Sequence, residues 1–562
     1  MLDNNNKISL ALKLLDLNVA TKWFIRDSKD DFYPDVLKYK DIKYSIDNKI
    51  DFINIKSIYG YEFICDKVPK KGGLLRDSIW IHPELRIVYT AILHYLLPKI
   101  DHKIPHQIYS YRLDSESFDD YPFNNSMMRW KGFHNDAISA CIDEKIDTIL
   151  ITDLSAYYDH IDVKKLINII EDVLGPAIIE EDRLVLHLLE QLLLLWSNNG
   201  YGIPQNIDTS SFLGSLYLYH VDKSILKQRF RYFRWVDDIK ICTSNENQAY
   251  RALHYLQEIL TENRLFISGA KTKVINRRDE KNWNDIIDVC DDKLISDLEI
   301  AIDSQNKKEI DNLMENILEL FKRSYLDDDK KFRAVASRLL DCCSMYSDIY
   351  HDLYSEIIDL IINRIDTHPE KMNTWCDMLS GVENLKLNEK IFDELIYKPS
   401  LYNWKRYHLI RLLITIPDAN TKDVRDYLWS VSRGEISLHE AYIAIICLGK
   451  YSCDNERKII FEKFFKCQGS VIIKRAVIIA IQELNLNDRD KLYNLALNIS
   501  PQLKPLIEYI EQLNKPEYGE SRWSTKKVSE KRISKNYIRK GVGMVDGKRV
   551  YYSLSKSDFS YD

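Results

Sequence analysis

The chain has 562 residues, of which 45% are hydrophobic and 29% charged, and its formal net charge is −6. This length exceeds what one core accommodates, so two or three domains of a soluble globular protein are expected. The ten cysteines form no CxxC pair, and the longest leucine-rich run, HLLEQLLLLW at 187–196, is too short to span a bilayer. The composition therefore excludes a disulfide framework, a cysteine-rich zinc site and a membrane protein, and predicts a cytoplasmic location.

Residues 51–285 alternate short β-rich runs with amphipathic helical runs. The predicted strands are YEFICDKV (61–68), DTILITDL (147–154), RYFRWVDDIKIC (231–242) and KTKVINR (271–277). The predicted helices are RIVYTAILHYLL (86–97), VKKLINIIEDVL (163–174), RLVLHLLEQLLLLW (183–196) and NQAYRALHYLQEILTEN (247–263). Strands interleaved with helices indicate an α/β or α+β body.

From about Lys293 onward almost every segment has helical periodicity. Similar segments start near residues 331, 405, 439 and 474, so the last three recur at about 35 residues. That period is typical of a helix-pair solenoid of the HEAT type. An irregular helical bundle is the alternative.

The C-terminal tail is basic on an otherwise acidic chain. Residues 515–549 hold eleven Lys or Arg against four Asp or Glu. The segment GMVDGKRVYYSL (543–554) predicts a hairpin that turns at Asp546-Gly547. Such a tail is compatible with a nucleic-acid partner, although a solvated charged tail is the commoner explanation.

Two adjacent carboxylates, Asp237 and Asp238, interrupt the β-favouring run 231–242. Like charges in an apolar run cost free energy unless a cation compensates them. A second strand, 148–152, ends immediately before Asp153. If the two segments lie side by side on one sheet, their carboxylates would bind a divalent metal, Mg²⁺ first and Mn²⁺ as the alternative. Two such ions can activate an attacking hydroxyl and neutralise a leaving pyrophosphate.

Five segments, in family order, resemble the motifs of reverse transcriptases. VPKKGGLLRDSIWIHPELRIVYTAI (68–92) resembles the fingers motif, and DLSAYYD (153–159) resembles the first palm motif, D-x-x-x-[FY]-[FY]-D. GYGIPQNIDTSSFLGSLYLYHVD (200–222) resembles the G-[IL]-P-Q-G element. WVDD (235–238) resembles [YF]-x-D-D, and NRLFISGAKTKVI (263–275) resembles the segment that places a Lys-Thr pair beside the triphosphate.

The resemblance implies an α+β right-hand polymerase with palm and fingers, followed by an all-α HEAT-like repeat domain. The domains it predicts are an N-terminal extension (1–60), fingers (61–135), palm (136–289), helical repeats (290–514) and the basic aromatic tail (515–562).

The resemblance also implies the catalytic roles. Asp153 and Asp237 would hold both metal ions, with the Leu154 carbonyl assisting and Asp238 as a supporting carboxylate. Lys271 would protonate the departing pyrophosphate as a general acid.

The nucleotide-binding roles follow in the same way. Lys70, Lys71 and Arg76 would bind the triphosphate of a dNTP substrate. Tyr158 would be the steric gate against a ribose 2′-hydroxyl, and Gln205 would touch the sugar.

One residue departs from the family pattern. Asn206 stands where a glycine usually follows Pro-Gln, a position at which glycine allows close approach of the backbone, and this puts conventional template handling in doubt. His220 and Asp222, at the end of the same segment, show no metal-ligand pattern and are expected to be structural.

The fusion to helices, with no ribonuclease H or maturase pattern, resembles the bacterial abortive-infection and defence-associated reverse transcriptases. IYSYRLDSESFDDYPFNNSMMRW (108–130) resembles their inserted segment. This resemblance implies synthesis of a DNA product in antiphage defence, by homo-oligomers or with a partner reverse-transcriptase-like protein. Synthesis would be template-free, primed by a protein, or directed by a non-coding RNA.

Three alternatives stay open. The palm could be a silent scaffold whose helices bind a partner, or the protein could be a retroelement enzyme. The segment RGEISLH, Arg433 to His439, also has the spacing of a HEPN ribonuclease, although Gly434 is unfavourable in the helix that such a site needs.

Overall fold

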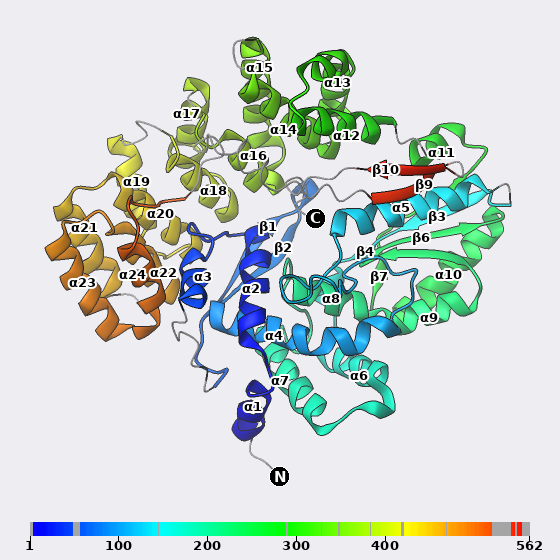
Figure 1. Ribbon diagram of the computed structural model, residues 1–562, viewed down its shortest axis with the longest axis horizontal. Coiled ribbons are helices and arrows are strands. Elements are labelled where there is room, and N and C mark those ends of the chain that lie inside the picture. Colours follow the sequence, from blue (N-terminus) through cyan, green and yellow to red (C-terminus); the bar gives the residue numbers. More distant parts are fainter. Residues whose placement is uncertain are drawn as a thin grey trace. The chain divides into compact units, whose positions relative to one another are not determined.

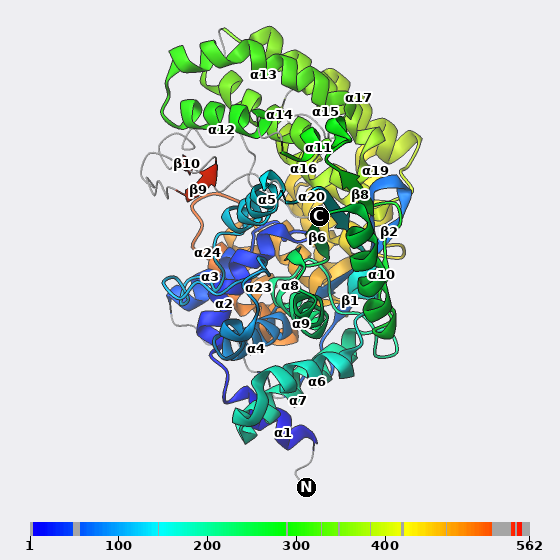
Figure 2. The same ribbon diagram turned by 90° about the vertical axis from the view of Figure 1, so that its right-hand side faces the viewer.

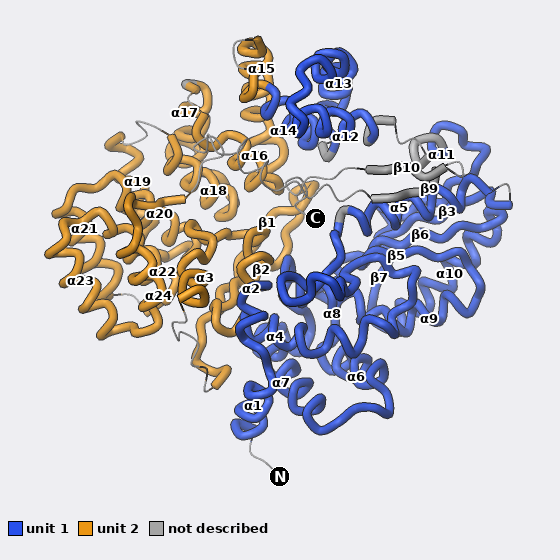
Figure 3. The backbone as a smooth tube through the Cα atoms, in the orientation of Figure 1, with its two compact units in different colours: residues 1–23, 87–342, 536–562 blue, residues 24–86, 343–535 orange. Residues whose placement is uncertain are grey.

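A computed structural model describes residues 4–48, 55, 57–143, 145–287, 290–327, 329–346, 349–382, 384–416, 421–467, 469–519, 541–545 and 548–552. The chain forms two compact units (Figure 3). Unit 1 comprises residues 1–23, 87–342 and 536–562, and unit 2 comprises residues 24–86 and 343–535. The domain boundaries predicted from the sequence were placed between motifs, whereas the two units are defined by contacts within the fold. The predicted boundaries therefore stay a prediction.

Unit 1 contains a four-stranded antiparallel sheet (Figure 1). Its strands, in spatial order, are β5 (Arg231–Trp235), β6 (Asp238–Thr243), β3 (Thr148–Thr152) and β8 (Lys273–Asn276). β-Branched and aromatic residues, which suit a pleated surface, fill much of these strands. Three of these strands lie inside runs that the sequence predicts to be β, and β6 extends one residue beyond its predicted run, to Thr243.

Both faces of this sheet are covered by helices (Figure 2). On one face α5 (Ser126–Ile142) and α11 (Glu280–Ile287) enclose a core that includes Cys141, Ile149, Cys242, Ile275 and Trp283. On the other face α10 (Glu246–Glu262) packs against β3, β6 and β8. It buries Ala249, Ala252, Leu256 and Leu260, which share one side of the helix. The sheet is therefore a rigid platform for the residues at its ends.

The remaining elements of unit 1 are mainly helices. They are α1 (Asn4–Leu12), α4 (Pro83–Ile100, which begins in unit 2), α6 (Val163–Leu174), α7 (Glu180–Trp196), α8 (Asp208–Tyr217), α9 (Tyr219–Lys227), α12 (Cys290–Asp303), α13 (Lys307–Asp327) and α14 (Asp329–Met345, which ends in unit 2). Two short strands, β4 (Leu154–Ser155) and β7 (Phe266–Ile267), pair with each other. In the tail, β9 (Gly541–Val545) and β10 (Lys548–Tyr552) pair antiparallel, which confirms the predicted hairpin, although its turn residues lie outside the described part of the chain.

The described residues of unit 2 form a hairpin and a series of helices. The hairpin strands are β1 (Phe63–Pro69) and β2 (Leu75–Ile81). The helices are α2 (Leu17–Asp27, which begins in unit 1), α3 (Lys40–Asp47), α15 (His351–Thr367), α16 (Met372–Leu379), α17 (Leu385–Phe392), α18 (Asn403–Leu413), α19 (Lys422–Val431), α20 (Leu438–Tyr451), α21 (Asp454–Ile460), α22 (Val471–Ala480), α23 (Leu486–Ile499) and α24 (Lys504–Glu511). Between residues 290 and 519 the described residues form helices and no strand, as the periodicity predicts.

In unit 2 several helices pack against the one two places further along the chain: α16 against α18, α18 against α20, and α20 against α22 (Figure 1). At the last contact, a Cβ added to Gly449 would come within 2.4 Å of Ala480, so the helices touch through a glycine. Arg406 donates two hydrogen bonds to the carboxylate of Glu440, at 2.9 and 2.8 Å, across a sequence separation of 34 residues. This separation agrees with the predicted repeat length, and assignment to the HEAT type stays a prediction.

Two further expectations concern helices. None of the helices that the structure describes is long and apolar enough to cross a membrane. In the RGEISLH segment, Arg433 is exposed, whereas His439 is buried and stacks on Tyr33 with ring centroids 3.9 Å apart. This arrangement does not favour the ribonuclease alternative.

Candidate active site

Two acidic segments meet at one end of the unit 1 sheet. β3 ends at Thr152, which lies opposite Ile239 of β6, so the next residue, Asp153, reaches the level of Asp238. Asp237 occupies the tight turn that joins β5 to β6. The fold therefore brings together the carboxylate-bearing segments that the sequence places about eighty residues apart.

The neighbouring carboxylates affect the pKa of Asp237. Asp237 is partly exposed, and its pKa is raised to about 8, by burial first and then by the charges of Asp153 and Asp238. Asp153 is buried, with an exposed fraction of 7%. Because repulsion between like charges weakens with distance, the charges of Asp153 and Asp238 both lie near enough to Asp237 to disfavour its ionisation.

Lys271 places a cation on this cluster. Its ammonium lies 2.8 Å from Oδ2 of Asp153, although 68% of its side chain is exposed. Burial lowers the pKa of Lys271, but the hydrogen bond to Asp153 and the nearby carboxylates outweigh burial, so the net shift is upward. The segment is fixed to the sheet by the N–H of Ser268, which donates to the Asp153 carbonyl at 2.8 Å, and by the hydroxyls of Thr152 and Thr272, 2.7 Å apart.

The turn that carries Asp237 has a strained backbone. Val236 has a φ of +47°, in the left-handed region that a β-branched residue rarely adopts. Strain of this kind persists only where the surroundings hold the backbone in place.

A buried ion pair supplies that restraint. Arg234 is fully buried, and its guanidinium donates to both carboxylate oxygens of Asp222 at 2.7 and 2.6 Å and to the Val236 carbonyl at 2.6 Å. The hydroxyl of Tyr232 donates to the same carboxylate at 2.7 Å. The Val236 N–H donates to the hydroxyl of Ser110 at 3.1 Å. Both polar backbone groups of Val236 are thus held by side chains.

These contacts agree with the structural role expected for Asp222 and add Arg234 and Ser110, which sequence reasoning missed. A signal for Arg234 was available, because it is an arginine inside the apolar strand RYFRW. A charged residue in such a strand needs a buried partner. No comparable signal marks Ser110, whose contact crosses 126 residues of sequence.

Tyr158 lies beside the carboxylates in a short 3₁₀ turn, Tyr157–His160. A Cβ on Gly214 of α8 would come within 3.2 Å of its ring, so glycine lets the ring lie close to this helix. The adjacent Tyr157 hydroxyl donates to the Gly214 carbonyl at 2.5 Å. Burial, and then the charge of Asp237, raise the pKa of Tyr158. The ring is therefore fixed near the carboxylate cluster.

Gln205 and Asn206 lie on the loop before α8. The Gln205 side-chain amide donates to Oδ1 of Asp159 at 2.7 Å, which ties this loop to the Tyr158 turn. Asn206 has a φ of +60°. Among residues with a side chain, asparagine tolerates this conformation best, so the chain keeps the backbone that a glycine would give.

Lys70, Lys71 and Arg76 belong to unit 2, around the tip of the β1–β2 hairpin. The tip residues Gly72 and Gly73 have φ values of +79° and +80°, which only glycine adopts without strain. The hairpin thus gathers three cations around one tight turn. Their role at the triphosphate stays a prediction.

The donor set fits a divalent cation of the Mg²⁺ type, because Asp153, Asp237 and the Leu154 carbonyl offer oxygen ligands. Burial first, and then the neighbouring carboxylates, raise the pKa of Asp237, and Lys271 pairs with Asp153. Within the described residues, however, no three His, Cys, Asp or Glu side chains are grouped so that they could hold an ion. The metal ligands therefore stay a prediction.

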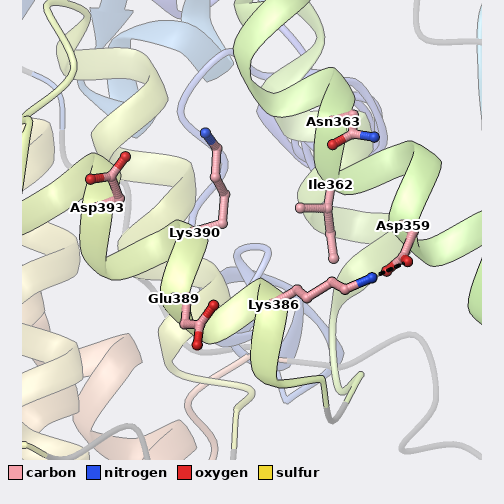
Figure 4. A pocket seen from close by; sticks show the side chains of 7 residues that line it. All are labelled: Asp359, Ile362, Asn363, Lys386, Glu389, Lys390 and Asp393. Carbon is pink, nitrogen blue, oxygen red and sulfur yellow. Dashed lines mark hydrogen bonds and ion pairs between the residues drawn. The ribbon is translucent and has the colours of Figure 1, made fainter.

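A pocket of about 350 Å³ lies between α15 and α17 in unit 2 (Figure 4). Its lining residues are Asp359, Ile362, Asn363, Lys386, Glu389, Lys390 and Asp393. Lys386 pairs with Asp359, and Lys390 pairs with Asp366 at 2.6 Å. Because these charges neutralise each other, the pocket offers little attraction to a phosphate or a metal ion, and we do not assign the activity to it.

A comparison with known protein families covers this part of the chain. Residues 68–326 match the family model described as reverse transcriptase (RNA-dependent DNA polymerase), and this range includes the hairpin tip and the carboxylate cluster. The protein is accordingly a nucleotidyltransferase. More particularly, it is a reverse-transcriptase-like enzyme, whose matching region comprises the β1–β2 hairpin tip and the unit 1 sheet.

Two other comparisons add little. Among solved structures, telomerase from Candida albicans in complex with a TWJ fragment of telomeric RNA is similar at 10% identity and a TM-score of 0.28, over 85% of this chain and 71% of that one. A TM-score of this size supports no inference. No curated protein matches the chain.

Proposed function

We propose that the protein is a DNA polymerase of the reverse-transcriptase type, which adds dNTPs by two-metal-ion nucleotidyl transfer and acts in antiphage defence by abortive infection. The observation that carries the proposal is the electrostatic coupling of Asp237 to Asp153, with Lys271 paired to Asp153, inside the region that matches the reverse transcriptase family. Coupled carboxylates with a perturbed pKa, next to a cation at the end of a rigid sheet, are typical of catalytic sites.

Asp153 and Asp237 are the proposed metal ligands, with the Leu154 carbonyl and Asp238 in support. Bound Mg²⁺, or Mn²⁺ as the alternative, would supply charge neutralisation at the attacking hydroxyl and the leaving pyrophosphate. The protein itself positions the two carboxylates. The strand β3 holds Asp153 in place, and the restrained turn at Val236 holds Asp237 in place.

Lys271 is proposed as the general acid. Its raised pKa keeps the ammonium protonated, and its exposed side chain is held at the cluster by one ion pair with Asp153. A pyrophosphate oxygen that leaves the cluster would accept a proton from Nζ.

Tyr158 and Gln205 are proposed to select the sugar. The Tyr158 ring is backed by Gly214 and cannot retreat without displacing α8, so a 2′-hydroxyl that meets it would clash. Gln205 is held near the same turn by Asp159. Deoxynucleotides are therefore the expected substrates, with Lys70, Lys71 and Arg76 as the triphosphate ligands.

The defence role, the oligomer and the source of template rest on the resemblance to abortive-infection reverse transcriptases. Template-free synthesis, a protein primer, a non-coding RNA and a partner reverse-transcriptase-like protein all remain within this proposal. The main support is the combination of a reverse-transcriptase-like region with a helical second half.

A direct test is incorporation of radiolabelled dNTPs by the purified protein with Mg²⁺. We expect incorporation by the wild type and none by the Asp237→Ala, Asp238→Ala variant. Omitting added template separates template-free from templated synthesis. Equal incorporation by wild type and variant would refute the proposal.

Phage-infection assays distinguish the alternatives. A silent scaffold would protect cells equally well with and without the carboxylates, whereas a polymerase acting in defence would lose protection in the same double variant. A retroelement enzyme would be encoded beside an intron or retroelement RNA, which neighbouring DNA would reveal.

A further inference from the structure

One face of the β1–β2 hairpin is buried within unit 2. Along its strands Val68, Ser78 and Trp80 are buried, whereas Lys67 and Asp77 are exposed and pair with each other on the opposite face. β1 packs against α18. Because an isolated two-stranded hairpin is marginally stable in water, this packing is what gives the hairpin a defined position.

Polar contacts fix the hairpin to two further helices. The hydroxyl of Ser437, which caps α20, donates to Oδ2 of Asp66 at 3.1 Å, and Nδ1 of His439 lies 3.5 Å from the same oxygen. The N–H of Val471, the first residue of α22, donates to Oε2 of Glu62 at 2.9 Å. Hydrogen bonds to carboxylates are among the stronger ones in proteins.

Arg76 is supported through an intervening segment. Its guanidinium lies over the ring of Phe32, 5.7 Å from the centroid. The Phe32 carbonyl accepts hydrogen bonds from the indole N–H of Trp404 at 2.8 Å and from His408 of α18 at 3.1 Å. The hydroxyl of Tyr407 donates to the Pro34 carbonyl at 2.5 Å. The helix α18 thus holds the segment against which Arg76 packs.

We propose that α18, α20 and α22 hold the nucleotide-binding hairpin in position, and that they thereby set the affinity for the incoming dNTP. The proposal rests on the proposed function of Lys70, Lys71 and Arg76. Holding these cations in a fixed arrangement before the substrate arrives removes part of the entropic cost of binding it. In this view the helical half is a working part of the polymerase, and Asp66 and Phe32 are positioning residues.

The test compares two matched variants of the hairpin. Asp66→Asn removes a charge that faces the helices, and Asp77→Asn removes the same charge from the exposed face. We expect Asp66→Asn to raise the KM for dNTP about 3–10-fold with kcat within about two-fold, because it loosens the hairpin without touching the chemistry. Asp77→Asn should leave both constants near those of the wild type.

A second variant covers the case in which Asp66→Asn does not fold. Phe32→Leu removes the ring beside Arg76 and keeps the backbone carbonyl that α18 holds, so it should also raise KM with an unchanged melting temperature. Lys70→Ala reports on the hairpin itself. If Lys70→Ala raises KM while Asp66→Asn and Phe32→Leu do not, the helices do not set the affinity for dNTP, and the proposed role of the hairpin in binding nucleotide stands. If Lys70→Ala also leaves KM unchanged, the hairpin does not bind the nucleotide. That result would refute both its proposed nucleotide-binding role and its proposed support by the helices.

Discussion

Replacing Asp237 with asparagine should abolish polymerase activity and stabilise the metal-free protein. The folded-state pKa of Asp237 is about 8 against an ordinary value of 3.8. The folded protein therefore binds this proton more tightly than the unfolded chain, and the contribution of Asp237 to stability falls as pH rises from about 4 to about 8. The full shift corresponds to at most about 6 kcal/mol. Because Asp237 is partly exposed and its ionisation depends on that of the neighbouring carboxylates, we expect a smaller effect. Asp237→Asn should raise the free energy of unfolding by about 1–3 kcal/mol above pH 8.

The assay is thermal melting in EDTA at several pH values, with Glu258→Gln, an exposed carboxylate on α10, as the matched control. Asp237→Asn should melt a few degrees above wild type at pH 8.5, and the difference should shrink towards pH 5, where the wild-type carboxyl is already protonated. Added Mg²⁺ should stabilise the wild type and not the variant. A variant that melts below wild type at pH 8.5, or a gain that does not depend on pH, would refute the electrostatic account of the site.

Three other predictions concern neighbouring positions. Tyr158→Val should raise incorporation of rNTPs relative to dNTPs by about ten-fold or more, measured as the ratio of kcat/KM values, because the ring no longer meets the 2′-hydroxyl; an unchanged ratio would exclude the gate. Arg234→Met should lower stability by about 3–5 kcal/mol, measured by urea unfolding, because it leaves Asp222 buried without its partner; the double variant with Asp222→Leu should recover most of that loss. Asn206→Gly should change stability by less than about 1 kcal/mol, because the φ of +60° suits glycine, and it should raise incorporation on an added template if the side chain hinders template binding.

Local pattern was sufficient to predict the elements that carry the site. Helix α6 begins and ends where the predicted helix does, at residues 163 and 174, because its apolar residues repeat at helical spacing. The strands β3 and β5 lie in the predicted β-runs, and β6 exceeds its run by one residue. The pairing of these strands brings Asp237 close enough to Asp153 for their charges to interact. Periodicity and acidic residues at strand ends are local features, which a single sequence displays.

The division into units could not be predicted in this way. Residues 24–86 belong to the same unit as the helical half. Arg475 of the helical half donates hydrogen bonds to two carboxylates of this segment, Asp35 and Asp41. These contacts span more than 430 residues. Neither carboxylate stands in a motif, so nothing in the sequence around them indicates a partner so far along the chain.

The two buried ion pairs suggest why the chain retains such costly groups. Desolvation offsets much of the attraction in a buried ion pair, so Arg234–Asp222 and Arg475–Asp35 are weak sources of stability. Each one instead fixes a position. The first holds the strained turn beside Asp237, and the second holds the segment that carries Phe32, the support of Arg76. If position is what these contacts supply, apolar residues of similar volume in place of Arg234 and Asp222, or in place of Arg475 with both Asp35 and Asp41, should leave the melting temperature nearly unchanged. The first replacement should lower kcat, and the second should raise KM.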